Sequence, residues 1–113
     1  MVAAKYSVQV NGLTNIALTK LDVLSKFRTL KVCTGYKFKN EEIKWLPADE
    51  HVFSEVVPVY KEFNGWNSLI DQCASFDELP KEARTYIDFI EQSLEIPVKY
   101  ISIGQRRDQI IFR

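Results

Sequence analysis

The sequence predicts an α/β or α+β fold, and three observations support this prediction. Apolar and polar residues alternate over residues 31–38 (KVCTGYKF), which is typical of a strand with one buried face. An apolar stripe at helical spacing then runs through residues 79–97 (LPKEARTYIDFIEQSLEIP). Two short apolar stretches after this helix are typical of further strands. Strands on both sides of a helix indicate a sheet with at least one crossover helix.

The first part of the chain is expected to hold a helix and three short strands. Residues 3–10 (AAKYSVQV) resemble the end of a helix with no cap before it, so the chain begins either with a frayed terminus or inside a larger protein. After a turn, residues 16–18 (IAL) are expected to form a strand buried on both faces. One face of the strand at 31–38 carries Val32, Thr34, Tyr36 and Phe38. The turn KNEE then predicts that residues 42–45 (EIKW) return as a hairpin partner.

A second extended stretch precedes the main helix. Residues 56–66 (VVPVYKEFNGW) are expected to be extended, with Pro58 at a sheet edge because proline has no N–H for the strand ladder. Asn64 and Gly65 form a turn signal that ends this stretch. Residues 75–78 (SFDE) match a capping box. The chain is therefore expected to turn twice before the helix begins.

The main helix and the strands after it have clear limits in the sequence. Pro80 suits the first helical position, and Pro97 ends the helix. Its apolar stripe consists of Ala83, Ile87, Ile90 and Leu94. Residues 98–104 (VKYISIG) predict a strand that ends on a glycine, and residues 108–113 (DQIIFR) predict a last short strand.

Composition narrows the class of protein. The 113 residues fit one domain, and 15 basic residues balance 15 acidic ones, so no net charge attracts nucleic acid or an anionic membrane. Cys33 and Cys73 form no disulfide or metal pattern and are expected to be reduced thiols of a cytoplasmic protein. A single histidine, His51, argues against a metal site. The sequence has no stretch long and apolar enough to span a membrane, and no signal peptide. It also has no Ser-His-Asp arrangement and no glycine-rich phosphate loop, so we assign no catalytic or metal residue.

Lys20, Leu21 and Asp22 form the first candidate binding turn, at the end of a predicted strand. A carboxylate there can accept two parallel N–H bonds, which guanine offers from N1 and its 2-amino group and adenine does not. The lysine stem can lie along a flat base while its ammonium reaches solvent. The alternative is a solvated turn that holds an ion pair. Taken alone, these residues favour that alternative.

Ser102, Ile103 and Gly104 form the second candidate turn. A strand that ends on these residues presents a hydroxyl group and backbone N–H groups, and glycine lets a ligand approach closely. Nucleotides bind at strand ends in α/β sheets. A simple glycine turn between two strands explains the segment equally well. Arg106 and Arg107 are either a phosphate contact or solvated surface residues.

Together the segments resemble one family. NGLTNIALTKLDVLSKF, KVCTGYKF, YKEFNGW, SFDELPKEARTYIDFIE and IPVKYISIGQRRDQIIFR follow one another as in the C-terminal part of adenylosuccinate synthetases. The resemblance implies a GTPase-like, P-loop NTPase-related α/β fold with a mixed sheet. It also implies a cytoplasmic homodimeric enzyme that joins IMP and L-aspartate, using GTP and Mg²⁺, in purine biosynthesis.

The resemblance also implies which residues bind the nucleotide. In the family, the KLD turn and the later S-x-G turn line the guanine pocket, which would place Lys20, Leu21, Asp22, Ser102, Ile103 and Gly104 there. The family usually has proline where this chain has Gln105, and glycine where it has Lys26 outside the pocket. Its phosphate loop, its catalytic aspartate and histidine and its substrate-aspartate loop do not occur in these 113 residues. Residues 1–113 are therefore expected to be a C-terminal portion that carries the guanine-base half of the GTP site and is inactive alone.

A second hypothesis belongs to a different class of function. The chain could be a free-standing, non-catalytic α/β module that derives from such an enzyme and acts through contact with another protein. A natural product of about this length would favour this module, whereas a reading frame that continues into a phosphate loop would favour the enzyme.

Overall fold

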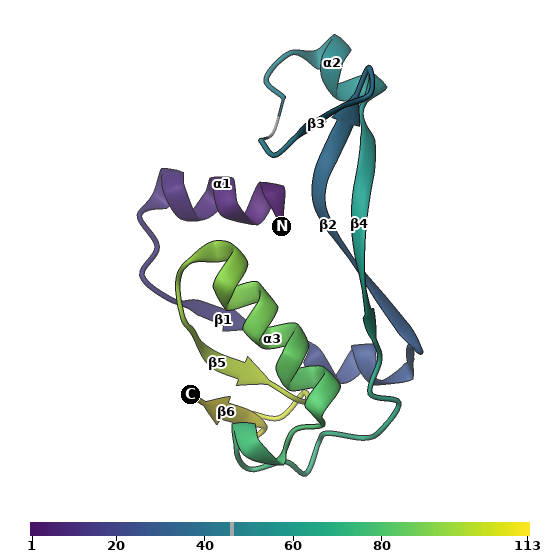
Figure 1. Cartoon of the computed structure of the whole chain (residues 1–113). Helices are drawn as coiled ribbons and strands as arrows, with labels where there is room; N and C mark the ends of the chain where they lie inside the picture. The colour runs from purple at the N-terminus through teal and green to yellow at the C-terminus, as the bar shows by residue number, and fades with distance from the viewer. Residues whose placement is uncertain (46) are drawn as a thin grey trace.

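The computed structural model describes residues 1–45 and 47–113, which form two three-stranded sheets with helices beside them (Figure 1). The first sheet has the order β1-β5-β6, where β1 is Ile16–Leu18, β5 is Val98–Ser102 and β6 is Ile110–Phe112. β1 and β5 are parallel, and β5 and β6 are antiparallel. The sheet is therefore mixed, and the prediction of a mixed α/β architecture is confirmed.

The main helix, α3 (Lys81–Leu94), leads into β5 and supplies one side of the core (Figure 1). The four residues of its predicted stripe are all buried, as expected. They pack in one apolar cluster with residues from both ends of the chain, among them Leu21, Ile101, Ile103 and Ile111. The predicted start was wrong by one residue: Pro80 is the N-cap, and the helix begins at Lys81.

The second sheet extends away from the first as a long, twisted ribbon (Figure 1). Its central strand is β2 (Thr29–Phe38), which pairs antiparallel with β3 (Glu41–Ile43) and with β4 (Val57–Asn64). The predicted hairpin is therefore confirmed. In the described part of the chain, β4 pairs with β2 alone, so Pro58 lies on a sheet edge as predicted.

The predicted continuous face of β2 was wrong. The register of β2 against β4 shifts between Cys33 and Gly35, so an extra residue interrupts the alternation. Val32 is buried, whereas Thr34, Tyr36 and Phe38 are only half-buried. The buried position after the shift is Gly35.

The helix predicted at the start of the chain is present as α1 (Val2–Asn11), and it ends at Gly12 in a left-handed conformation with φ 59°. β1 is not buried on both faces, as its apolar run had suggested, because Ala17 is exposed. A short helix, α2 (Glu50–Glu55), carries His51 at the surface. Trp66 is buried in the core, whereas Trp45 is exposed. Within the described residues, no helix is long and apolar enough to cross a membrane.

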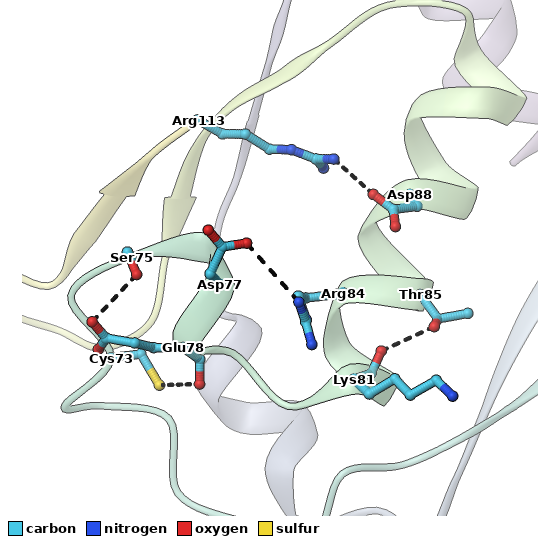
Figure 2. Close-up of polar contacts among 9 residues, drawn as sticks. All are labelled: Cys73, Ser75, Asp77, Glu78, Lys81, Arg84, Thr85, Asp88 and Arg113. Atoms are coloured by element: carbon cyan, nitrogen blue, oxygen red, sulfur yellow. Dashed lines mark hydrogen bonds and ion pairs between the residues drawn. The ribbon is translucent and has the colours of Figure 1, made fainter.

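Polar side chains make contacts in the segment before α3 and at the end of the chain, among them Ser75 with Glu78 and Arg113 with Asp88 (Figure 2). The Glu78 carboxylate accepts from the Ser75 hydroxyl at 3.3 Å and from the Ala74 N–H at 2.8 Å. The predicted capping box was wrong, because the Ser75 side chain accepts no backbone N–H and Glu78 reaches the N–H of Ala74 instead of that of Ser75. This carboxylate closes the short 3₁₀ helix η2 (Phe76–Glu78). The Arg113 guanidinium pairs with Asp88 of α3 at 2.7 Å, which fixes β6 against the helix.

Candidate functional site

The two predicted binding turns lie at one hollow of about 570 Å³. β1 and β5 are parallel neighbours, so the turns that follow them meet at the same edge of the sheet. The first turn contributes Thr19, Lys20, Asp22 and Val23 to the lining, and the second contributes Ser102, Gly104 and Gln105. Segments from opposite ends of the sequence therefore form one concave surface.

The first turn has an unusual backbone. Lys20 adopts a left-handed conformation, with φ 62° and ψ 34°, which is uncommon for a residue other than glycine. This conformation redirects the chain from β1 into the 3₁₀ helix η1 (Leu21–Lys26). Leu21 is 1% exposed and anchors the turn in the core. Asp22 is half-buried beside it and lines the hollow.

The alternative of a solvated turn agrees with the exposure of Lys20, although the ion pair that it included does not form between Lys20 and Asp22. Among the ion pairs between described residues, none joins Lys20 to Asp22. The Asp22 carboxylate and the Lys20 ammonium both remain available to a molecule in the hollow. A turn built in this way can accept hydrogen bonds from a ligand at Asp22.

The second turn is held by its own hydrogen bonds. The Ser102 hydroxyl donates to the Gly104 carbonyl at 3.0 Å. The Ile103 N–H donates to the Gln109 carbonyl at 3.0 Å, and the Ile103 side chain is 2% exposed in the core. Since the side chains of Leu21 and Ile103 are both buried, these two predicted site residues can offer a ligand only backbone groups.

The side-chain amide of Gln109 lies against Gly104, so a larger residue at position 104 would have to displace that amide. A Cβ atom at Gly104 would lie 2.1 Å from the Gln109 Oε1. The prediction attributed this glycine to close approach of a ligand, and the structure adds an approach by the Gln109 amide. Gln109 was missed because a glutamine beside an arginine-rich turn has no distinctive sequence signal.

The other candidate residues lie outside the hollow. Arg106 pairs with Asp108 at 3.2 Å, and Arg107 is exposed; neither lines the hollow. Lys26 also lies outside it, as expected, whereas Gln105 is part of the lining. The departure from the family pattern at residue 105 therefore changes the surface of the site itself.

The residues present do not fit a magnesium site. Across residues 1–45 and 47–113, no group of three or more histidine, cysteine, aspartate or glutamate side chains is placed to hold a metal ion. Asp22 is the one carboxylate in the lining of the hollow. The lining residues contain no cysteine or histidine, and their polar side chains can donate and accept hydrogen bonds.

Comparisons with known proteins point to one family. The family model described as adenylosuccinate synthetase matches residues 1–111. The chain is 50% identical over 111 residues to the adenylosuccinate synthetase of Flavobacterium psychrophilum, covering 98% of this chain and 26% of that protein. It is 50% identical over 107 residues to the enzyme of Geotalea daltonii, covering 95% of this chain and 25% of that protein.

A solved structure agrees with the sequence matches. The fully ligated adenylosuccinate synthetase from Plasmodium falciparum superposes with a TM-score of 0.91 at 36% identity, over 96% of this chain and 27% of that chain. The chain therefore spans about a quarter of the length of the relatives that it matches.

Proposed function

This chain belongs to the adenylosuccinate synthetase family, and on that premise we propose that it is the part of such an enzyme that holds the guanine base of GTP. The observation that carries the proposal is the hollow of about 570 Å³ between the two strand-end turns. Its size lies within the range of small-molecule pockets, which is roughly 300–1,000 Å³. The one carboxylate in its lining, that of Asp22, can accept hydrogen bonds from a ligand in defined directions.

Asp22 would read the Watson–Crick edge of the base. Its carboxylate has two oxygens that accept hydrogen bonds, matching the N1–H and 2-amino donors of guanine. Adenine has an acceptor at N1 and no 2-amino group, so it would leave the half-buried carboxylate without partners. A site built on such bonds rejects an analogue that lacks the donors by roughly 10⁴-fold or more.

The remaining lining residues would hold the plane of the base. The Lys20 stem would lie along one face of the ring, with its ammonium toward solvent. The turn at Ser102, Ile103 and Gly104 would close the other side, with backbone groups and the Ser102 hydroxyl directed at the ring edge. Gln105 would add a polar side chain where the family usually has proline.

We also propose that residues 1–113 are the C-terminal portion of a GTPase-like, P-loop NTPase-related fold. The support is the order of the matching segments, with the KLD turn before the S-x-G turn, and the absence of a glycine-rich phosphate loop from the sequence. The phosphates of GTP and Mg²⁺ would be held by the remainder of the synthetase chain. Among the residues that the structure describes, no group of carboxylate, histidine or cysteine side chains is placed to hold that ion.

The intact enzyme is proposed to be a cytoplasmic homodimer in purine biosynthesis. It would join IMP and L-aspartate to form adenylosuccinate with hydrolysis of GTP. Family membership supports these assignments. In that enzyme, this segment would select the nucleotide and would leave the bond-forming steps to other residues.

The test is Asp22→Asn in the full-length synthetase that contains this segment. An amide offers one acceptor and an unwanted donor. A hydrogen bond to a charged group contributes roughly 1.5–3 kcal/mol, so kcat/KM for GTP should fall about tenfold or more. The preference for GTP over ITP, whose base lacks the 2-amino group, should shrink.

Asp77→Asn is the matched control, because Asp77 is an exposed aspartate in η2 and does not line the hollow. It should keep the wild-type ratio of kcat/KM values for GTP and ITP. An unchanged ratio in Asp22→Asn would remove Asp22 from base recognition.

A further inference from the structure

The side-chain amide of Gln109 joins three parts of the chain. Its Oε1 accepts from the Arg106 N–H at 3.1 Å, and its Nε2 donates to the Asp71 carbonyl at 3.2 Å. Its backbone adds two more hydrogen bonds, from the Ile103 N–H to the Gln109 carbonyl at 3.0 Å and from the Gln109 N–H to the Arg106 carbonyl at 3.1 Å. One residue therefore ties both ends of the second turn together and connects that turn to the loop at Asp71.

Gln109 also touches the wall of the hollow without being part of its lining. The space where a Gly104 Cβ would stand is filled by the amide, 2.1 Å from Oε1 and 2.4 Å from Cδ. Gly104 and Gln105 line the hollow, and Gln109 does not. The amide thus supports the wall from outside the hollow.

We propose that Gln109 is a positioning residue for the base pocket, an inference that rests on the proposed function. By holding Ile103 and Arg106, it sets where Gly104 and Gln105 stand across the hollow from Asp22. A pocket wall that is ordered before the ligand arrives avoids the cost of ordering it on binding. Loss of Gln109 therefore weakens nucleotide binding and leaves the chemical step unchanged.

The test uses the full-length synthetase that contains this segment. Gln109→Met keeps the length of the side chain and removes both hydrogen bonds of the amide. We expect the KM for GTP to rise about tenfold, while kcat at saturating GTP and the KM for IMP stay at wild-type values. A change confined to the KM for one substrate indicates lost binding of that substrate.

Two further variants sharpen the result. Gln109→Glu keeps the acceptor for the Arg106 N–H but sets a carboxylate oxygen against the Asp71 carbonyl oxygen, so the KM for GTP should rise at least as much as in Gln109→Met. It also decides the matter if Gln109→Met does not fold. Gln92→Met, at an exposed position of α3, is the matched control and should keep wild-type constants.

The outcomes separate this inference from the proposal on which it rests. If Asp22→Asn weakens selection of GTP over ITP while both Gln109 variants keep the wild-type KM for GTP, the positioning role is wrong and the base site stands. If the variants at Asp22 and Gln109 all leave GTP kinetics unchanged, both proposals are overturned. A Gln109→Met enzyme that loses kcat, or loses affinity for IMP to the same extent, shows a general structural role and also overturns the inference.

Discussion

The indole N–H of Trp66 donates a 2.8 Å hydrogen bond to the hydroxyl of Ser25. Both residues are buried, at 7% and 8% exposure. Ser25 belongs to η1, which begins with the first turn of the proposed base site, and Trp66 packs against Tyr86 of α3 with ring centroids 6.3 Å apart. The hydrogen bond and the ring contact therefore connect η1, which begins in the proposed base-binding turn, to the main helix.

Ser25→Ala should destabilise the chain more than its small change in volume suggests. It leaves the buried Trp66 N–H without its acceptor, and an unsatisfied buried donor costs about 1–3 kcal/mol. Denaturant unfolding followed by tryptophan fluorescence measures the loss in the free energy of unfolding.

Ser68→Ala supplies the control, since Ser68 is an exposed serine close to Trp66 in sequence. A double-mutant cycle with Trp66→Phe isolates the interaction between Trp66 and Ser25. Phenylalanine has no N–H to donate, so Ser25→Ala should cost less free energy of unfolding in the Trp66→Phe background. Equal effects of Ser25→Ala and Ser68→Ala would show that the hydrogen bond contributes little.

Burial of Tyr86 predicts a loss of stability at high pH. Burial raises the pKa of its phenol above the ordinary value of about 10. The folded chain then holds this proton more tightly than the unfolded chain does. The contribution of neutral Tyr86 to stability is complete below about pH 10, and it is lost as the pH rises from there through the folded-state pKa.

The free energy of unfolding should therefore fall more steeply above about pH 10 in the wild-type chain than in Tyr86→Phe, which has no phenol to ionise. Denaturant unfolding of both chains on either side of this pH gives the two slopes. Identical slopes would mean that Tyr86 ionises equally easily in the folded and unfolded chains.

The parts of the fold that the sequence predicted depend on local patterns. The stripe of α3 follows from helical spacing, and the β2–β3 hairpin follows from a turn signal in which Lys39 and Asn40 adopt positive φ. Pro58 at an edge follows from its missing N–H. Each of these features is decided by residues that are close together in the chain.

The parts that were missed depend on contacts between distant residues. The shift in β2 appears only against β4, and the exposure of Ala17 depends on what covers each face of β1. The two site turns were each ambiguous alone, and they share a hollow only because β1 pairs with β5. The Gln109 amide meets Gly104 and Asp71 through tertiary packing, which spacing does not encode.

The roles of the site residues in nucleotide binding remain predictions.

The isolated 113-residue chain should show no synthetase activity with IMP, GTP, L-aspartate and Mg²⁺. Phosphoryl transfer is catalysed mainly by positioned charges and metal ions around the transferred group. The described residues form no metal cluster, and the sequence has no phosphate loop. Magnesium-dependent release of GDP from a preparation free of other synthetase would contradict this expectation.

The isolated chain should also bind guanine nucleotides weakly and with little preference for GTP over GMP. The proposed contacts to the base come from Lys20, Asp22, Ser102 and Gly104, and the lining of the hollow offers the β- and γ-phosphates no glycine-rich loop. Large apolar side chains such as Leu69 and Phe112 are exposed, at 88% and 74%, which favours association of the chain or a looser fold. Ordering a loosened half-site reduces the net binding energy.

We therefore expect a dissociation constant of about 1 mM or weaker, a range in which binding contributes only about 4 kcal/mol. Isothermal titration of the chain with GTP, GMP and ATP measures it, and ATP serves as the control for base selection. Asp22→Asn should remove whatever preference for GMP over ATP remains, because the carboxylate is the group that we propose to read the base. Micromolar binding of GTP with a strong preference over GMP would contradict the assignment, since it requires phosphate-binding groups within these 113 residues.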